Sequence, residues 1–328
     1  MIKRLFLSIF LSAMAIVAFA DNFTLSPAEQ KKITEEAEDW IDDMPDGLQD
    51  RLSDAVNHAL HGFYSEINYF RNMADTTGIS AFPVKVSEIT AGNGADIPIR
   101  IYSPENKKTS SSLPLLIYFH GGGWAMGSIS GVDKFCRALA AKGNVIVASV
   151  DYPLAPEHPF PAASLKAVEA IEYLAKNSIK WNADANNLSL GGDGAGGNIA
   201  LTAFNSLPSS IKVHSLVLYY PLIQTKGQLD PASKRQYGRG YGFDSRLWET
   251  FSQAYNAPFS DYKRPLPPTL LISAGRDIII SQEKEFAGIN NVRYIEFSGA
   301  IHGFITDGQQ KTAFKKAVEL TDYFILNN

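Results

Sequence analysis

The sequence predicts an α/β protein with a mostly parallel central sheet that helices cover on both faces. Short apolar segments alternate with helix-periodic segments over most of the chain, which is the pattern of parallel strands joined by crossover helices. The chain has 328 residues, 45% hydrophobic and 20% charged, which is enough for one large domain or two smaller ones. This composition excludes a disordered or fibrous chain.

The first twenty residues have the features of a secretory signal peptide. Two basic residues precede an apolar run over residues 5–19, and Ala18-Phe19-Ala20 is a small-x-small cleavage motif before a polar pair. An uncleaved membrane anchor is the alternative, but the run is short for a membrane span. Position 21 is not cysteine, so a lipoprotein is not indicated. We expect residues 1–20 to be removed and the protein to be exported, either periplasmic or secreted.

Charge and cysteine content narrow the possible partners. The formal net charge of −4 becomes −6 when Lys3 and Arg4 are removed with the signal peptide, and no basic block remains. We therefore expect no nucleic-acid partner and no membrane association after cleavage. The single cysteine, Cys136, excludes an internal disulfide, and its helical spacing with Phe135 and Leu139 predicts a buried apolar position. The sequence carries no pattern that predicts an oligomeric state.

Residues 21–80 are expected to form an N-terminal helical unit. Ser26-Pro27-Ala28-Glu29 is a capping box with proline in the first turn, and Pro45-Asp46-Gly47 divides the segment into two helices, ending near residue 75. His58 and His61 lie at i, i+3 in the second helix and could suggest a metal site. Because no further ligand cluster lies nearby in the sequence, two ordinary polar helix residues are the better interpretation.

From residue 84 onward, the spacing of apolar residues changes from that of helices to that of strands. Residues 84–89 and 97–102, separated by Gly92-Asn93-Gly94, predict a β-hairpin. An aromatic-rich insertion over about 224–266 suits a lid or pocket wall at the carboxyl ends of the strands, or a structural excursion that packs its aromatic rings inward. Further strands are predicted at 115–119, 145–150, 188–190, 213–219, 269–273 and 292–297, and helices near 131–142, 162–176, 196–206 and 310–326.

Two motifs fit residues 192–197, Gly-Asp-Gly-Ala-Gly-Gly. The first is the dinucleotide-binding G-x-G-x-x-G, but that motif requires an acidic residue about twenty positions on. Residues 199–222 contain neither Asp nor Glu, and the turn follows the fifth predicted strand instead of the first. The second is the nucleophile elbow G-x-S-x-G, which fits at every position except the apex, where Gly194 replaces serine. We reject the dinucleotide interpretation.

Two other segments support the elbow. His120-Gly121-Gly122-Gly123-Trp124 follows a strand, and its backbone N–H groups can face a developing oxyanion. Three adjacent glycines cost conformational entropy that a plain surface turn does not need. Asp277 and His302 each follow a later strand, so a carboxylate could fix the imidazole tautomer while the imidazole acts as a base.

With these motifs in this order, the sequence resembles the hormone-sensitive-lipase-like family of α/β-hydrolases, which includes bacterial carboxylesterases and acetyl esterases. The resemblance covers the chain from about residue 84 onward. It implies an α/β-hydrolase domain over residues 81–328, a helical cap over 21–80, Ser-His-Asp hydrolysis of short-acyl carboxylic esters, and neither a cofactor nor a metal. The matching segments are His120–Trp124, Asp151–Pro161, Gly192–Asn198 and His302–Phe304.

The resemblance also implies a role for each site residue. Asp277 and His302 would be the acid and the base, the amides of Gly122, Gly123 and Ala195 would form the oxyanion hole, and position 194 would hold the nucleophile. The sequence departs from the family in two places. Gly194 stands where serine is usual, and Ile278-Ile279-Ile280 stands where the family begins with proline and carries another acid.

Glycine at the apex closes the covalent acyl-enzyme route and leaves three hypotheses. The chain is a hydrolase scaffold without its nucleophile, natural or mutated, whose serine variant cleaves short-acyl esters. Alternatively, a water in the vacated space is activated by His302 and hydrolyses esters slowly. The third is a non-catalytic protein that binds a small ester or acid on the same fold, as the plant gibberellin receptors do. The expected partner is a small-molecule ester substrate or ligand in each case.

Overall fold

The computed structural model describes residues 24–72, 79–92, 94, 96–109, 111–290 and 292–328. The predicted signal peptide lies outside these residues, and so does Asn93 in the turn of the predicted hairpin. Within the described residues, no helix is both long enough and apolar enough to cross a membrane.

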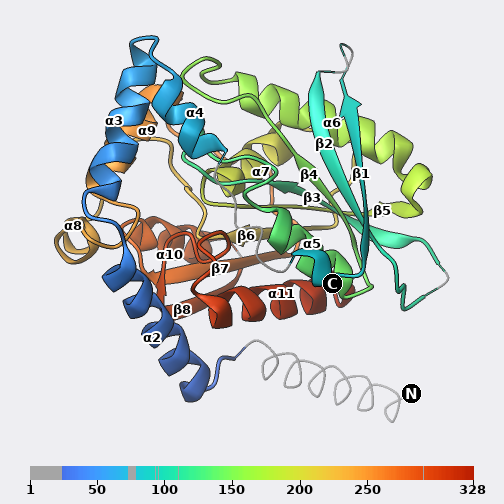
Figure 1. The fold of residues 1–328 in the computed structure, drawn as a ribbon. Coiled ribbons are helices and arrows are strands. Elements are labelled where there is room, and N and C mark those ends of the chain that lie inside the picture. Colours follow the sequence, from blue (N-terminus) through green and yellow to red (C-terminus); the bar gives the residue numbers. More distant parts are fainter. Residues whose placement is uncertain (1–23, 73–78, 93, 95, 110, 291) are drawn as a thin grey trace.

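Eight strands form one sheet in the described part of the chain, in the order β1-β2-β4-β3-β5-β6-β7-β8 (Figure 1). The hairpin β1–β2 is antiparallel, β2 pairs antiparallel with β4, and the pairings from β4 through β3 to β8 are parallel. The prediction of a mostly parallel sheet is confirmed. The strands are β1 (Val84–Ala91), β2 (Ile97–Pro104), β3 (Leu113–Phe119), β4 (Ile146–Val150), β5 (Ala183–Asp193), β6 (Ser215–Tyr219), β7 (Thr269–Arg276) and β8 (Arg293–Ile301).

Helices cover both faces of this sheet, which is why all residues of β4 and β6 are buried. Helices α5 and α11 contribute to one core, where Phe135, Cys136 and Phe324 are buried, and α6 and α7 contribute to the other. The burial of Cys136 agrees with its predicted position. The bounds are α5 (Asp133–Ala141), α6 (Ala162–Asn177), α7 (Ala195–Ser206) and α11 (Lys311–Leu326), with short 3-10 turns at Ile79–Ala81 and Ser178–Trp181.

The N-terminal segment forms three helices, not the two that the sequence predicted: α2 (Pro27–Asp43), α3 (Leu48–Leu60) and α4 (Ser65–Arg71). Helix α2 begins at the predicted capping box, in which the Ser26 side chain accepts from the Glu29 amide. The extra break follows α3, where Gly62 adopts φ 85° and ends the helix. Helix α2 packs against β8 and α11, whereas α3 packs against α9 (Ser245–Tyr255) of the insertion.

Three further helices were missed by the sequence analysis: α8 (Pro231–Tyr237), α9 (Ser245–Tyr255) and α10 (Ile280–Ile289). The first two carried a readable signal, because Asp230 and Asp244 are N-caps whose side chains accept backbone amides three residues on. Helix α10 has no side-chain cap and is short, so neither its start nor its period stands out in the sequence.

Several predicted strands are too short. Strand β5 begins at Ala183 instead of residue 188, and β8 continues to Ile301 instead of ending at 297. The additional residues pair with neighbouring strands: Ala183 pairs with Leu113, and Ile301 pairs with Arg276. Backbone pairing in a sheet extends strands past the apolar run that reveals them in sequence.

Candidate active site

The turn between β5 and α7 places Gly194 at the carboxyl edge of the sheet. Gly194 has φ 51° and ψ −116°, a conformation that side chains with a Cβ rarely adopt. Its amide donates to the Tyr219 carbonyl on β6, which fixes the turn. Two residues later, a Cβ on Gly196 would collide with the Phe119 carbonyl on β3. Small residues are therefore needed for α7 to start this close to the sheet.

His302 faces this turn from the loop after β8. A Cβ built on Gly194 would lie 3.3 Å from His302 Nε2. The other ring nitrogen, Nδ1, lies 2.6 Å from Asp277 Oδ2, and the Asp277 side chain is fully buried. Asp277 follows β7, and its second oxygen accepts from the Ile279 amide at 3.2 Å. The structure thus brings the three sequence-predicted positions 194, 277 and 302 together.

Aromatic rings hold the imidazole in place. Its centroid lies 4.6 Å from the ring of Phe243 and 4.7 Å from that of Tyr220. Phe243 belongs to the insertion, whereas Tyr220 follows β6. The His302 side chain is 16% exposed, so Nε2 faces the cavity while the rest of the ring is packed. This packing fixes the direction in which Nε2 can exchange a proton.

The glycine loop after β3 lines the same cavity as Gly194 and His302. Gly122 and Gly123 have φ values of 116° and 59°, and a Cβ on Gly123 would collide with the ring of Phe251. Within the described ranges, the amides of these two glycines donate to no acceptor of the chain. Ala195 is the first residue of α7, so its N–H also has no intrahelical acceptor. These three amides, predicted as oxyanion-hole donors, remain available to a ligand.

One buried carboxylate, Asp193, connects the parts of this site. Its Oδ1 accepts from the Tyr118 hydroxyl at 2.8 Å and from the Gly121 amide at 3.0 Å, and its Oδ2 accepts from the Tyr220 hydroxyl at 3.3 Å. The Tyr220 hydroxyl also accepts from the Ile305 amide in the His302 loop, at 3.2 Å. Burial raises the pKa of Asp193. Asp193 thus connects the glycine loop, the elbow and the His302 loop.

Glu283 on α10 is a second buried acid, and the sequence analysis missed it. Its side chain is fully buried and accepts a hydrogen bond from the Ser273 hydroxyl, while Oε1 has no partner among the described residues. Burial and the negative charge of Asp277 raise the pKa of Glu283 well above its usual range. This shift favours the protonated carboxyl, which would add no second negative charge behind Asp277.

We expect Glu283→Gln to raise the melting temperature at pH 7–8 by a few degrees. The folded-state pKa of Glu283 lies above that of the unfolded chain, so folding takes up a proton. This carboxyl therefore lowers the free energy of unfolding increasingly as pH rises above about 4.3, and glutamine removes that effect. Thermal unfolding from pH 4 to 8 should show a gain that disappears at the acid end. Glu285→Gln, an exposed site on the same helix, is the matched control and should change little. A gain independent of pH would contradict the account.

The cavity above the turn has a volume of about 640 Å³. The junction of α2 with α3 contributes to its walls, and so do the glycine loop and the insertion. Within the insertion, Phe243 and Phe251 line the cavity, whereas Tyr255 stacks on Trp124 at 4.7 Å in the core. Some aromatic residues of the insertion thus line the cavity, and another packs inward. The apolar lining includes Leu48, Leu52, Met126, Leu222, Leu247 and Phe251, and the polar lining includes Asp43, Ser128, Thr306, Asp307 and Gln309.

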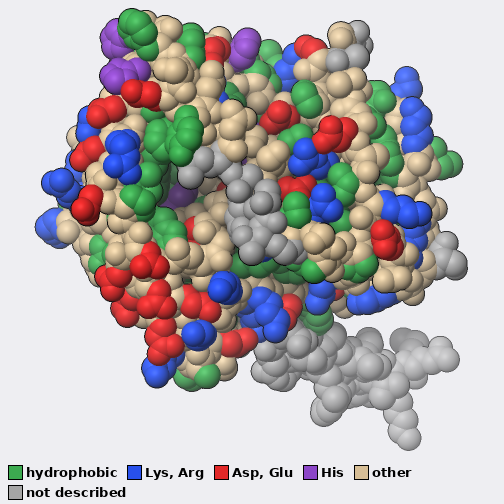
Figure 2. All heavy atoms as spheres, in the orientation of Figure 1, with side chains coloured by type: hydrophobic (Ala, Val, Ile, Leu, Met, Phe, Trp, Pro, Cys, Tyr) green, Lys and Arg blue, Asp and Glu red, His purple; other side chains and the backbone are tan. Residues whose placement is uncertain are grey.

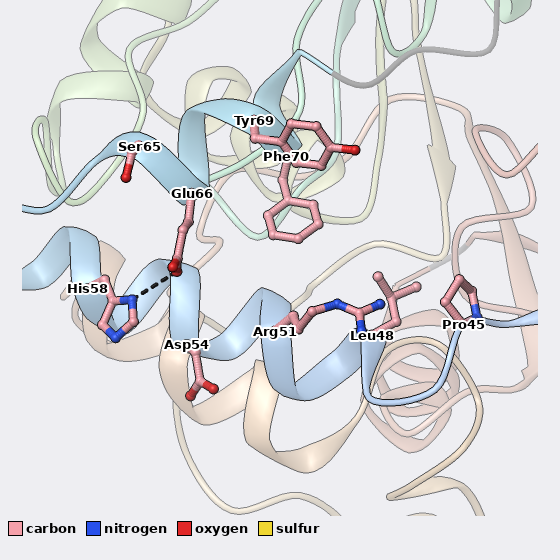
Figure 3. Close-up of a pocket in the computed structure, with 9 residues that line it drawn as sticks. All are labelled: Pro45, Leu48, Arg51, Asp54, His58, Ser65, Glu66, Tyr69 and Phe70. Carbon is pink, nitrogen blue, oxygen red and sulfur yellow. Dashed lines mark hydrogen bonds and ion pairs between the residues drawn. The ribbon is translucent and has the colours of Figure 1, made fainter.

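A second cavity of about 670 Å³ lies between α3 and α4, and it shares Pro45 and Leu48 with the first (Figure 3). His58 points toward Glu66 in this view, with Nδ1 and Oε2 2.8 Å apart. His61, the C-cap residue just after α3, contacts the Asn57 carbonyl at 2.8 Å. The described residues contain no group of three or more His, Cys, Asp or Glu side chains placed to hold a metal. Both histidines have ordinary polar partners.

Acidic side chains gather over α2, on the face shown in Figure 2. A cavity there is lined by four acidic residues, Gln309 and two lysines; the acidic residues are Glu36, Asp39, Asp42 and Asp43. Asp43 also lines the cavity above the turn at Gly194, so the acidic surface adjoins the candidate site.

An eight-stranded, mostly parallel sheet with a strained turn at its carboxyl edge, a histidine paired with a buried acid, and a glycine loop with free amides defines an α/β-hydrolase. A family model described as alpha/beta hydrolase fold matches residues 116–306, more than half of the chain. The chain belongs to this family, and the predicted fold class is confirmed.

Several relatives are esterases. The chain is 39% identical over 119 residues to carboxylesterase NlhH of Mycobacterium tuberculosis, covering 36% of this chain and 37% of that protein. It is 30% identical over 203 residues to the ethyl acetate hydrolase of Pseudomonas putida, covering 60% and 63%. The matches thus span less than two thirds of these relatives. Among solved structures, an esterase from the archaeon Pyrobaculum calidifontis superposes with a TM-score of 0.69 at 28% identity, covering 86% of this chain and 98% of that one.

Proposed function

We propose that this chain is a carboxylic-ester hydrolase scaffold for short-acyl esters that lacks its serine nucleophile. Gly194 stands at the nucleophile position, and the chain as written is inactive or very slow. The observation that carries this proposal is the 3.3 Å separation between a Cβ built on Gly194 and His302 Nε2, with Asp277 on the opposite nitrogen. A serine hydroxyl there would lie within hydrogen-bonding reach of the imidazole.

The remaining residues supply every part of ester hydrolysis except the nucleophile. His302 Nε2 would take the proton from an attacking oxygen and return it to the departing alkoxide. Asp277 would keep Nδ1 protonated and stabilise the imidazolium. The free amides of Gly122, Gly123 and Ala195 would stabilise negative charge on the carbonyl oxygen. Because glycine offers no oxygen, no acyl-enzyme forms on this chain, and only a water activated by His302 could attack.

Three features complete the proposal. Residues 1–20 are a signal peptide that directs the protein to the periplasm or the medium. Residues 21–80 act as a cap, which α3 supports by packing on α9 of the insertion. The partner is a small neutral ester, which fits a cavity of about 640 Å³ with a largely apolar wall.

The test compares the mature chain, Gly194→Ser and His302→Ala on p-nitrophenyl esters of increasing acyl length. We expect hydrolysis with Gly194→Ser only, highest for acetate and butyrate esters and lowest for long chains. Equal activity of the chain and Gly194→Ser, lost in His302→Ala, would instead identify direct water attack. No activity in any variant would favour a binding protein and overturn the hydrolase proposal.

The same serine substitution should lower thermal stability. Residues with a Cβ are strained at φ 51°, ψ −116°, by about 1–3 kcal/mol, and the neighbouring imidazole must also shift by a few tenths of an ångström. Thermal unfolding followed by circular dichroism measures the difference. Gly288→Ser is the control, since Gly288 lies in α10 with open space around its Cβ position. An unchanged or higher melting temperature for Gly194→Ser would contradict a strained turn.

A further inference from the structure

We propose that the chain as written binds a carboxylate anion at position 194. One carboxylate oxygen occupies the place of the missing serine oxygen beside His302 Nε2, and the other faces the amides of Gly122, Gly123 and Ala195. This inference rests on the geometry of the proposed hydrolase site and assigns that site a ligand, a short aliphatic or aromatic monocarboxylate.

The donors for such an anion converge on one side of the cavity. The amides of Gly122 and Gly123 donate to no acceptor of the chain in the described ranges, and Ala195 opens a twelve-residue helix whose positive dipole end faces the turn. His302 adds a fourth donor at Nε2 once the ring is protonated, because its Nδ1–H is already donated to Asp277 at 2.6 Å. Four donors match the two oxygens of a carboxylate, whereas a neutral ester carbonyl has one oxygen to place among them.

Glycine is what makes room for the second oxygen. The position of a Cβ on Gly194 lies 3.3 Å from His302 Nε2 and 3.9 Å from Tyr220 Cε2. A serine there would fill this space and satisfy Nε2 with its own hydroxyl. Loss of the side chain therefore leaves both an unfilled volume and an unpaired ring nitrogen, which an anion can occupy together.

The charges around His302 decide when the anion binds. A carboxylate on Nε2 and Asp277 on Nδ1 would both stabilise the protonated imidazole, so the anion binds together with a proton. The other carboxyls near the ring oppose this less than their number suggests. Burial raises the pKa of Asp193, Glu283 and Asp307, and this shift favours the neutral form of each carboxyl. Asp43 is exposed, so its repulsion is screened by salt.

The other residues that line the cavity indicate the chemistry of the ligand beyond its carboxylate. Leu48, Leu52 and Met126 form an apolar wall with Leu247 and Phe251, and neither lysine nor arginine is among the described residues that line it. A second anionic group on the ligand would therefore find no lysine or arginine among these residues to pair with. A monocarboxylate with a short apolar tail fits both the donors and this wall.

Isothermal titration calorimetry with sodium butyrate tests the proposal on the mature chain. Titrations at pH 7.5 in two buffers with different ionisation enthalpies give the number of protons taken up. We expect one site, uptake approaching one proton per butyrate, and binding of butyramide weaker by about tenfold or more, because the amide has no charge to pair with the imidazolium. Equal binding of butyrate and butyramide, no proton uptake, or no heat of binding would overturn it.

Variants locate the site. Gly194→Ala fills the vacated space with a methyl group and should weaken butyrate binding by about tenfold or more, whereas Gly288→Ala in open space should not. If Gly194→Ala fails to fold, His302→Gln serves instead and should abolish proton uptake. Unchanged butyrate binding in Gly194→Ala or His302→Gln would refute the site. Ester hydrolysis by Gly194→Ser tests the hydrolase proposal separately. If Gly194→Ser hydrolyses esters but the chain as written does not bind butyrate, the carboxylate-binding inference is wrong and the hydrolase proposal stands.

Discussion

Gly194→Ser is expected to raise the rate of p-nitrophenyl butyrate hydrolysis by about 10³-fold to 10⁶-fold. Removing the serine of a comparable hydrolase costs about a million-fold in turnover, while the oxyanion hole and substrate binding retain roughly 10³ to 10⁴ over water. The better the new serine oxygen contacts His302 Nε2, the closer the gain in rate should come to this million-fold loss. The Cβ position, 3.3 Å from Nε2, places the serine oxygen within reach of it.

The control for this gain is Gly194→Ala, which adds the Cβ and its strain but no oxygen. It should show no gain in steady-state hydrolysis over the parent chain, with folding checked by circular dichroism. A rise in Gly194→Ala equal to that in Gly194→Ser would mean that the added carbon, not a nucleophile, changes the activity. A gain below about tenfold in Gly194→Ser would contradict the proposed elbow geometry.

Asp277→Asn in the Gly194→Ser background is expected to lower kcat by about 10⁴-fold. Asp277 accepts from His302 Nδ1 at 2.6 Å and fixes the tautomer in which Nε2 is free to act as base. An asparagine amide can donate to Nδ1 instead, which would hold the proton on Nε2, and it would not stabilise the imidazolium. The defect should therefore appear in kcat at every pH where the enzyme is folded.

Asp307→Asn is the matched control for this loss. Asp307 lines the same cavity and is buried enough that its pKa is raised, but it accepts from the Gln309 and Gln310 amides and not from the imidazole. Steady-state kinetics of Asp307→Asn should stay within a few-fold of the Gly194→Ser parent. If Asp277→Asn kept more than about a tenth of kcat, Asp277 would not be the acid of this site.

The fold could be predicted because its signals are local. Alternation of buried strands with helices is visible in the sequence, and the positions of the turn, the glycine loop, Asp277 and His302 follow from strand ends that meet at one edge of a parallel sheet. Helices α8 and α9 follow N-caps at Asp230 and Asp244 that could have revealed them, whereas α10 has no side-chain cap and little apolar periodicity.

The supporting acids could not be predicted in the same way. Two partners of Asp193, Tyr118 and Tyr220, lie 75 and 27 positions away, and only the register of β3, β5 and β6 brings them together. Glu283 looks in sequence like any charged residue of a surface helix. Its burial depends on how α10 packs on β7, which no residue pattern near it reveals.

The central claim is that position 194 faces both the imidazole and the free amides. Labelling with a fluorophosphonate measures this directly, because such a probe bonds covalently only to a serine that a base activates. After incubation of the chain and of Gly194→Ser, intact mass and peptide mapping should show one adduct, on residue 194 of the variant, and none on the parent. A variant that stays unlabelled, or an adduct on another serine, would contradict the account.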